Sequence, residues 1–355
     1  MAQGPENERW LVVGQGLAGT VIALTLANRG VQVHVADAGL PWAASPVAAG
    51  AFNPVTGKRM QLTWLADELW PVLEAFYPQA EALLNARFFF ALPNLRPLLT
   101  AEERAEATRM TQAGPLAGWM TLTDVLPWAP ANQVVAPFGA LLVPRAGYVE
   151  VPVLCQAARH WLAADGAFFE QKVVPADLQS SEAGIIWQGR AYAGVIWAEG
   201  AAGKANPLLT QLPLAPLKGE ILLLAPQAPP TLAGAVLNRA AYLAPRPDGL
   251  LWAGSTYQHQ YESEGPTEEG RASILQRVGK FYLPGLGVEK HLAGIRPSVR
   301  DRRPIVGWLP EHAHQYVFTG LGTKGVSLAP WLAGVLADHL LVGKPVPDVV
   351  AVRQV

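Results

Sequence analysis

The chain contains little cysteine, no long apolar run and almost no excess of charge of either sign. Its one cysteine among 355 residues, Cys155, excludes an internal disulfide and a metal site built from several thiolates. We expect Cys155 to be a small buried hydrophobic residue. No uninterrupted apolar run approaches the roughly 20 residues of a membrane-spanning helix, so the sequence predicts a soluble protein.

The first ten residues have no basic stretch leading into an apolar core. A secretory signal is therefore not predicted, and we expect a cytoplasmic protein. A formal net charge of −1 gives no global attraction for nucleic acid or for an anionic membrane, although a local basic patch stays open.

Catalytic signatures of hydrolases and metalloenzymes are also missing. The chain has no HExxH, no Ser-His-Asp order and no carboxylate pair at a diagnostic spacing. His312 and His314 stand two residues apart, beside Glu311 in a loop that follows a proline. Such histidines are more often solvated, so no metal site is predicted. The chain length favours two structural units.

The opening segment has the pattern of a β-α-β unit. A short apolar strand, Arg9–Val13, is followed by a glycine-rich turn from Gly14 to Gly19 and by helical spacing as far as Asn28. Gly30 stands at the C-cap position, and residues 31–35 alternate as a second strand that leads to Asp37.

Each glycine of this turn has a physical purpose. Gly14 makes the tight turn, Gly16 lets the backbone approach a pyrophosphate, and Gly19 permits close packing of helix on strand. The helix N-terminus, at Leu17 and Ala18, offers free N–H groups to phosphates. Asp37 can accept hydrogen bonds from ribose hydroxyls. Dinucleotide binding is therefore predicted, and a glycine turn with a purely structural role is the alternative.

A second glycine-rich turn lies near the end of the chain. Tyr316–Gly320 is typical of a strand, and residues 321–325 lead to an apolar helix predicted from about Leu328 to Leu341, with Pro330 in its first turn and Gly343 at its C-cap. In a flavoprotein this turn would face the pyrimidine end of the isoalloxazine, where Lys324 would stabilise negative charge. The alternative is a glycine turn with a solvated lysine.

Several motifs occur along the chain in a fixed order. They are Ala48–Pro54, Gly147–Leu154, Ala167–Val174, Val195–Gly200, Pro216–Glu220, Tyr242–Arg246, Ala253–Thr256, Gly294–Pro297 and Pro304–Gly307. In this order they resemble the D-amino-acid-oxidase-like family of FAD-dependent oxidoreductases, which includes glycine oxidase, sarcosine oxidase and the oxidase domain of a tRNA wobble-uridine modification enzyme. The resemblance covers nearly the whole chain.

The resemblance implies an α/β fold with a discontinuous Rossmann-type FAD-binding domain, over residues 1–60, 145–212 and 290–355. A second, α+β substrate domain on a mostly antiparallel sheet would take residues 61–144 and 213–289. The implied cofactor-binding residues are Gly14, Gly16, Leu17, Ala18, Gly19, Asp37, Ala49, Gly50, Val173, Val174, Gly200, Gly320, Gly322, Thr323, Lys324 and Gly325. No cysteine is found around Phe318, where sarcosine oxidases attach FAD, so a non-covalent flavin is expected.

The residues themselves also predict a second unit. Apolar spacing indicates a helix over Leu62–Phe76, and Thr100 with Glu103 forms a capping box for another helix. Strands are predicted over Val134–Val143, Gly219–Leu224, Val236–Leu243 and Leu250–Gly254, with a hairpin turn at Pro247–Gly249.

Arg296 is the predicted anchor of the substrate, because a guanidinium grips a carboxylate through two parallel hydrogen bonds. The alternative is an arginine paired with Asp301 or with backbone carbonyls. Tyr242 matches a pocket position of the family and can donate its hydroxyl, or it is an ordinary cross-strand aromatic. With Lys324, these are the residues predicted to act in catalysis.

The predicted reaction is oxidation of a C–N bond of a small amino acid or secondary amine, with hydride transfer to N5 of FAD. It needs mainly positioning of the substrate carbon and a deprotonated amine. Oxidation of a modified tRNA base is an alternative, indicated by Gly320–Gly325 and by Arg300, Arg302 and Arg303, as is a flavin-binding protein without turnover. For Lys58 and Arg59 three environments are open: a cofactor phosphate, an acidic substrate or solvent. The sequence does not identify the electron acceptor or the oligomeric state.

Overall fold

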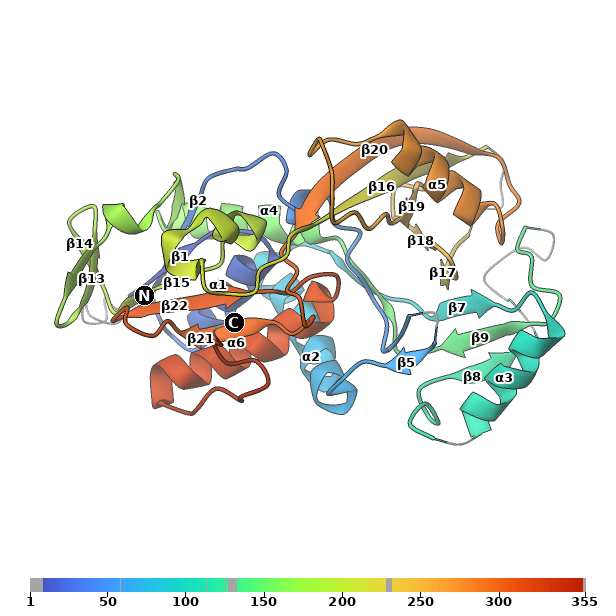
Figure 1. The fold of residues 1–355 in the computed structure, drawn as a ribbon, viewed down its shortest axis with the longest axis horizontal. Coiled ribbons are helices and arrows are strands. Elements are labelled where there is room, and N and C mark those ends of the chain that lie inside the picture. The colour runs from blue at the N-terminus through green and yellow to red at the C-terminus, as the bar shows by residue number, and fades with distance from the viewer. Residues whose placement is uncertain are drawn as a thin grey trace.

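The fold has two regions side by side, a parallel sheet with its helices and a larger mixed sheet (Figure 1). The structure is a computed structural model that describes residues 9–57, 59–112, 114–124, 126, 133–227 and 232–353. Lys58, one of the residues considered above, lies outside the described residues.

The first region is built on a six-stranded sheet in the order β11-β2-β1-β15-β22-β21. Its strands come from the start, middle and end of the chain: β1 (Trp10–Val13), β2 (Val33–Asp37), β11 (Phe168–Glu170), β15 (Gly194–Trp197), β21 (Ile305–Trp308) and β22 (Gln315–Thr319). All neighbours are parallel except β21 and β22, which are antiparallel. Helix α1 (Leu17–Asn28) connects β1 to β2. The predicted β-α-β unit is confirmed.

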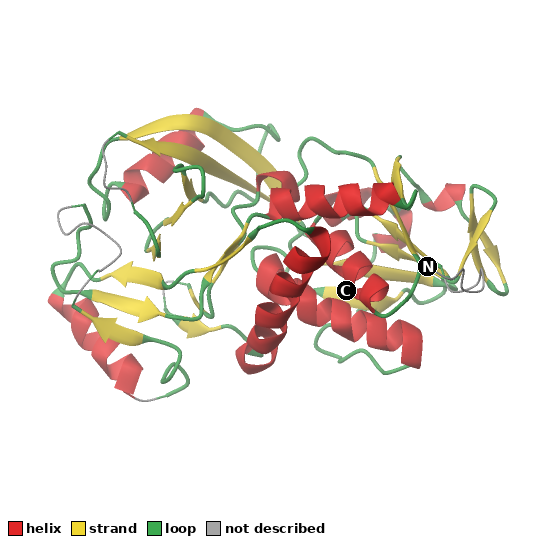
Figure 2. Ribbon diagram, turned by 180° about the vertical axis from the view of Figure 1, so that it is seen from behind, coloured by secondary structure: helices red, strands yellow, loops and turns green. Residues whose placement is uncertain are grey.

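The parallel sheet is covered on both faces. Val12, Val35 and Ile196 face one core, which they share with helices α1, α2 (Ala66–Leu84), α4 (Val151–Ala164) and α6 (Gly325–Val342). Figure 2 shows these helices gathered on one side. Leu11 and Val195 face the opposite core, together with residues of the strands β13 (Gly184–Trp187) and β14 (Arg190–Tyr192). The exposed strand β12 (Gln179–Ser181) pairs with β13. Burial on both faces explains why these parallel strands are so apolar.

Helix α6 is long and apolar enough to cross a membrane by length and composition, which the sequence analysis did not anticipate. Half of that stretch is buried in the protein, where Leu332 and Leu336 are fully enclosed, and α6 packs against α1 and α2. A single helix of this kind is weak evidence for a membrane span, because core helices of soluble proteins have the same composition. The cytoplasmic location stays a prediction.

The second region is an eight-stranded sheet in the order β20-β16-β19-β18-β17-β7-β9-β8. Its strands are β7 (Asn94–Pro97), β8 (Thr121–Thr123), β9 (Ala140–Val143), β16 (Leu217–Pro226), β17 (Val236–Asn238), β18 (Tyr242–Pro245), β19 (Leu251–Gly254) and β20 (Leu286–Arg296). Only β7 and β17 pair in parallel. The predicted mostly antiparallel sheet is confirmed. Helices α3 (Ala101–Gln112) and α5 (Glu268–Val278) pack on it.

Shorter strands join the two regions. A three-stranded sheet consists of β3 (Ala51–Phe52), β10 (Gly147–Val149) and β6 (Phe89–Ala91), and β4 (Val55–Thr56) forms a hairpin with β5 (Gln61–Leu62). The division at residues 60, 145, 213 and 290 stays a prediction. Helix α2, which the sequence analysis placed in the second unit, packs in the core of the first against α6.

Three stretches of strand have limits that differ from the sequence pattern. The strand predicted over Val236–Leu243 is wrong: β17 and β18 are separate strands, because the chain turns at Arg239, whose N–H donates to Ala241 O. Within the motif Ala167–Val174, which resembles a strand of the family, β11 takes only Phe168–Glu170, since its partner β2 ends at Asp37. Strand β9 takes only the last part of the stretch predicted to begin at Val134.

Two helices also have limits that differ from the predicted ones, because each includes residues outside the apolar pattern that predicted it. The helix predicted over residues 62–76 begins at Ala66 and continues to Leu84. Helix α6 begins at Gly325, so Pro330 lies inside it and not in its first turn as predicted. The C-cap at Gly343 is confirmed by its φ of 68°.

His34 on β2 makes stability depend on pH. Burial, with Arg9 and Arg190 nearby, lowers the pKa of His34 from 6.5 to about 4. The neutral ring accordingly favours the folded state above pH 6.5, and this contribution is lost as pH falls from 6.5 towards 4. We expect His34→Gln to flatten the loss of stability in that window, measured as the urea midpoint against pH.

The control is His160→Gln on α4, whose side chain is exposed. It should follow the pH profile of the unaltered protein. If His34→Gln loses stability over this window as steeply as the unaltered protein does, His34 is not the titrating group.

Candidate active site

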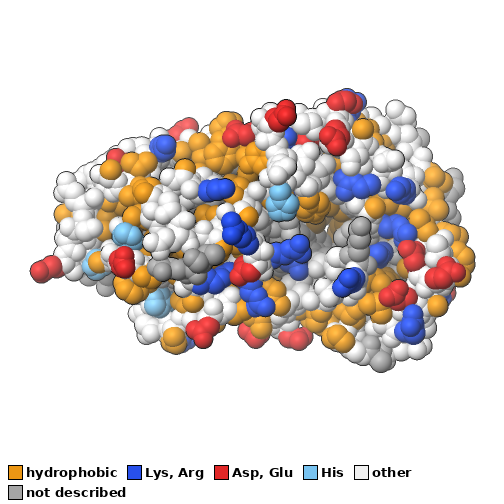
Figure 3. Space-filling model, viewed as in Figure 1, with side chains coloured by type: hydrophobic (Ala, Val, Ile, Leu, Met, Phe, Trp, Pro, Cys, Tyr) orange, Lys and Arg blue, Asp and Glu red, His pale blue; other side chains and the backbone are white. Residues whose placement is uncertain are grey.

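One cavity of about 2410 Å3 lies between the two sheets. Figure 3 shows the hollow in the middle of one face, with Lys and Arg side chains around it. Of the predicted site residues, only Gly19 is absent from its lining. The residues that do line it are Gly14, Gly16, Leu17, Ala18, Asp37, Ala49, Gly50, Val173, Val174, Gly200, Tyr242, Arg296, Gly320, Gly322, Thr323, Lys324 and Gly325.

The turn from β1 into α1 has no space for a side chain at Gly14 or at Gly19. Gly14 adopts a φ of 99°, and a Cβ there would stand 2.4 Å from Ala198 O. A Cβ on Gly19 would stand 1.8 Å from Gly14 O, which confirms that α1 packs closely against this turn. The first turn of α1 contains no acidic residue and faces the cavity, so its electrostatic field favours an anion there.

Asp37 stands at the end of β2, beside that turn. Its carboxylate accepts the N–H of Gln15 at 2.6 Å and that of Gly39 at 2.8 Å, and it lies 3.6 Å from Arg159 of α4. Gln15 and Arg159 also contact each other, at 3.0 Å. Sequence reasoning missed both residues, and nothing near Arg159 in the sequence points to Asp37.

The glycine turn before α6 reaches the same cavity from the end of the chain. Gly320 and Gly322 have φ values of 78° and 53°, and the first turn of α6 is free of acidic residues. Lys324 caps α6, and its Nζ donates to Thr63 Oγ1 at 3.2 Å. Burial, with Arg302 nearby, lowers the pKa of Lys324. Lys324 is therefore not a solvated surface lysine.

Two further segments complete this side of the cavity. Gly50 has a φ of 63° and packs so closely on β10 that a Cβ would stand 1.9 Å from Val149 O. Val173 and Val174 follow β11 in a loop, and Gly200 opens a short turn with a φ of 62°. Arg59 is exposed and does not line the cavity, which favours solvent as its environment.

Arg296 ends β20 and lies across Gly219 of β16. A Cβ on Gly219 would stand 2.0 Å from Arg296 Nη1, so only glycine leaves room for the guanidinium. Nη1 donates to Thr256 O at 3.2 Å, and the guanidinium stands 5.1 Å from the ring centre of Tyr257. The alternative pairing of Arg296 with Asp301 is wrong, because the Asp301 carboxylate binds Arg353 at 2.8 Å. The alternative pairing with a backbone carbonyl holds for Nη1 of Arg296.

Tyr242 lies opposite Gly254 in the pairing of β18 and β19. A Cβ on Gly254 would stand 3.0 Å from the Tyr242 hydroxyl, so this glycine makes room for the phenol. Burial raises the pKa of Tyr242, and Arg296 opposes that shift only in part. The hydroxyl therefore keeps its proton at neutral pH and can donate a hydrogen bond.

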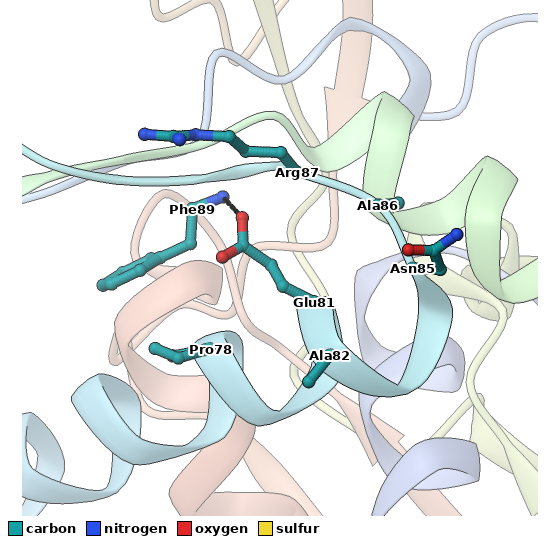
Figure 4. Close-up of a pocket in the computed structure, with 7 residues that line it drawn as sticks. All are labelled: Pro78, Glu81, Ala82, Asn85, Ala86, Arg87 and Phe89. Carbon is teal, nitrogen blue, oxygen red and sulfur yellow. Dashed lines mark hydrogen bonds between the residues drawn. The ribbon is translucent and has the colours of Figure 1, made fainter.

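A second, smaller hollow lies at the end of α2, lined by Pro78, Glu81, Ala82, Asn85, Ala86, Arg87 and Phe89 (Figure 4). Its one carboxylate, Glu81, accepts the N–H groups of Phe88 and Phe89 at 2.6 and 2.7 Å. The carboxylate holds the connection from α2 to β6, so its role there is structural.

Two helix N-termini without acidic residues converge on one cavity, and Asp37 stands at the end of the second parallel strand. The glycines of the two turns leave room for phosphates, so these residues fit a dinucleotide. Fold and site define a Rossmann-type dinucleotide-binding protein with a second sheet closing the cavity. Residues 9–339 match the family described as FAD dependent oxidoreductase, and the chain belongs to this family.

Among curated relatives, the chain is 28% identical to the tRNA 5-methylaminomethyl-2-thiouridine biosynthesis bifunctional protein MnmC of Azoarcus sp. (strain BH72), over 98% of this chain and 59% of that protein. The chain therefore spans less than two thirds of that relative. It is 26% identical to glycine oxidase of Pseudomonas putida KT2440, over 96% of this chain and 97% of that protein.

Solved structures show the same fold. Glycine oxidase of Bacillus cereus ATCC 14579 matches with a TM-score of 0.80 and 22% identity, over 96% of both chains. Iminodiacetate oxidase of Chelativorans sp. BNC1 matches with a TM-score of 0.75 and 22% identity, over 95% of this chain and 96% of that one. The expected combination of an FAD-binding Rossmann-type region and a second sheet is thereby confirmed.

Gly19→Ala tests the close packing of the first turn. The added methyl would collide with Gly14 O, so we expect a loss of about 1–3 kcal/mol of stability and weaker retention of FAD. Thermal unfolding and the flavin absorbance of the purified protein measure the two effects.

Gly334→Ala in α6 is the matched control, because a Cβ there meets nothing within 4 Å. It should leave FAD retention unchanged and gain up to about 1 kcal/mol from helix propensity. Equal behaviour of the two variants would contradict the packing argument.

Proposed function

We propose that this protein oxidises a C–N bond of a small amino acid or secondary amine, with non-covalently bound FAD as the hydride acceptor. The main support for this proposal comes from Arg296. Its guanidinium lines the cavity and has no carboxylate partner in the described part of the chain. Glycine oxidase and iminodiacetate oxidase, by their names, oxidise small amines that bear carboxylates, which supports this proposal.

The residues around the cavity have separate parts in this reaction. Arg296 binds the substrate carboxylate through two parallel N–H donors and so fixes the carbon next to the amine. The protonated hydroxyl of Tyr242 orients the bound substrate by a hydrogen bond. When bound, FAD supplies a hydride acceptor. Lys324, with the N-terminus of α6, stabilises negative charge on that side of the cavity.

Non-covalent binding is supported by the position of the one cysteine. Cys155 Sγ accepts a hydrogen bond from Thr20 at 3.6 Å, under the first turn of α1 and beside the proposed phosphate site. Burial raises the pKa of Cys155 to about 11, so the thiol stays protonated and a poor nucleophile. We expect acid denaturation to release all of the flavin into the supernatant.

Arg296→Lys tests the carboxylate anchor. Lysine keeps the charge but loses the two parallel donors, so we expect KM for the best amine to rise about ten- to hundredfold. The flavin spectrum should stay unchanged. The measurement is anaerobic bleaching of the flavin across a panel of amino acids and secondary amines.

Arg29→Lys is the control, since Arg29 forms an exposed ion pair with Asp338 far along the chain. If Arg296→Lys bleaches with the same KM as Arg29→Lys, Arg296 does not bind the substrate. If no amine in the panel bleaches the flavin of the unaltered protein, the proposed function is wrong.

Oxidation of a modified tRNA base is a second candidate. Arg302 and Arg303 line the cavity, and the Arg303 guanidinium stands 5.3 Å from the ring centre of Trp64, so cations and an aromatic ring lie together. The similarity to the bifunctional tRNA-biosynthesis protein supports this candidate. We expect retention of tRNA that weakens steeply with salt; no retention at low salt would end it.

A further inference from the structure

The basic residues of this protein are concentrated around one cavity. Among the residues that the structure describes, 12 Lys and Arg residues line it, whereas three Asp and Glu residues do. The 12 are Arg96, Arg159, Lys172, Lys204, Arg239, Arg277, Lys280, Arg296, Arg300, Arg302, Arg303 and Lys324. The three acids are Asp37, Glu199 and Asp301. A near-neutral chain thus surrounds its cavity with positive charge, as Figure 3 shows.

The acidic side chains of the lining have other partners. Asp37 faces Arg159 and the Gln15 N–H, and Asp301 binds Arg353. Burial raises the pKa of Glu199, which favours its neutral form. Among the 12 cations, Arg159 faces Asp37 and Arg239 binds Glu103, and the others form no ion pair with the described residues. Most of the positive charge of the lining is therefore without an ion-pair partner in the described part of the chain.

A dinucleotide accounts for the cations of the first region only. Arg159 lies beside Asp37 and the turn of α1, and Lys324 caps α6. A different set belongs to the second region: Arg96 on β7, Arg277 on α5 and Lys280 directly after it. These residues lie on β7 of the eight-stranded sheet, on the helix that packs against that sheet and in the turn after this helix.

Arg277 and Arg296, which line the cavity, are both held by backbone carbonyls. Nη1 of Arg277 donates to Ser255 O and to Ala240 O, each at 3.1 Å, whereas Arg296 donates to the carbonyl of Thr256, the residue after Ser255. Nη2 of Arg277 is buried without a hydrogen-bond partner among the described residues. Arg277 and Arg296 thus donate to the carbonyls of two consecutive residues, and both arginines line the same cavity.

Lys280 adds a third charge. It is exposed at the cavity and forms no ion pair within the described ranges, and Gly279 is all that separates it from the end of α5. Arg239, in contrast, is already neutralised by Glu103 at 2.8 Å. Adjacent cations without counter-charge repel one another, so an anion placed between them is strongly favoured.

A single carboxylate occupies only the two donors of one arginine. We propose that the amine substrate carries a second anionic group, a carboxylate or a phosphate, which Arg277 and Lys280 bind while Arg296 holds the first. This inference rests on the proposed function and narrows it to amines with two anionic groups. Arg96, whose Nη1 donates to Gly57 O at 3.3 Å, borders the same space.

The test uses three glycine derivatives that differ in one substituent on nitrogen: carboxymethyl, phosphonomethyl and the neutral methyl ester of carboxymethyl. The rate of anaerobic flavin reduction over substrate concentration is measured for the FAD-loaded protein. We expect the two charged compounds to exceed the ester at least tenfold, with an advantage that shrinks as salt is added. Which of the two is faster identifies the anion.

Lys280→Gln should reduce the rate with the charged compounds three- to tenfold more than the rate with the ester. Lys290→Gln on β20, an exposed lysine outside the lining, makes the same change of charge and should have no effect. Both lysines are exposed, and neither forms an ion pair with a residue that the structure describes, so both variants should fold.

Each outcome decides between the two proposals. Equal reduction by all three compounds overturns the second anionic site and leaves the proposed function standing. A charge preference that Lys280→Gln does not weaken overturns the assignment to Arg277 and Lys280. If none of these compounds reduces the flavin while simple amino acids do, the second anionic site is also overturned. If no amine reduces the flavin, the proposed function itself is overturned.

Discussion

The contact between Gly14 and Gly19 is the constraint on which the rest of the site depends. A side chain at either position would collide with backbone, so β1, its turn and α1 can approach only in this form. The approach directs the first turn of α1 into the cavity and places Asp37, at the end of the neighbouring strand, beside it. The later elements build on this corner: α6 packs along α1, and its own glycine turn reaches the same cavity.

The second sheet depends on a similar absence of a side chain. Gly219 leaves the space that the Arg296 guanidinium fills, in the long pairing of β16 with β20. Because Arg296 ends β20, it stands where the second sheet meets the parallel one. Lys218 and Glu220 flank Gly219 on β16 but point away from the cavity, and they form a buried pair at 3.3 Å. One strand thus serves the site on one face and the core on the other.

The electrostatic character of the molecule follows from placement and not from composition. A formal net charge of −1 argues against nucleic acid or another polyanion as a partner, and yet the cavity lining is strongly basic. The acids are mostly elsewhere on the surface, or paired, as Glu103 is with Arg239. Low-dielectric walls around such a lining focus its field, so an anionic substrate is attracted at short range even though the whole protein is almost neutral.

Local patterns in the sequence determined the β-α-β unit, the glycine turn before α6, the caps at Gly30 and Gly343 and the predominantly antiparallel second sheet, since these depend on neighbouring residues and on periodicity. They also picked out Arg296, Tyr242 and Lys324, all of which line the cavity. Only the tertiary structure decided which partners these residues have. Arg353 binds Asp301, Arg159 approaches Asp37 from α4, and Arg277 donates to Ser255 O next to the carbonyl that Arg296 binds. The physical reason is that such pairs join residues far apart in the chain, whose meeting is fixed by how the two sheets pack and leaves no local trace in sequence.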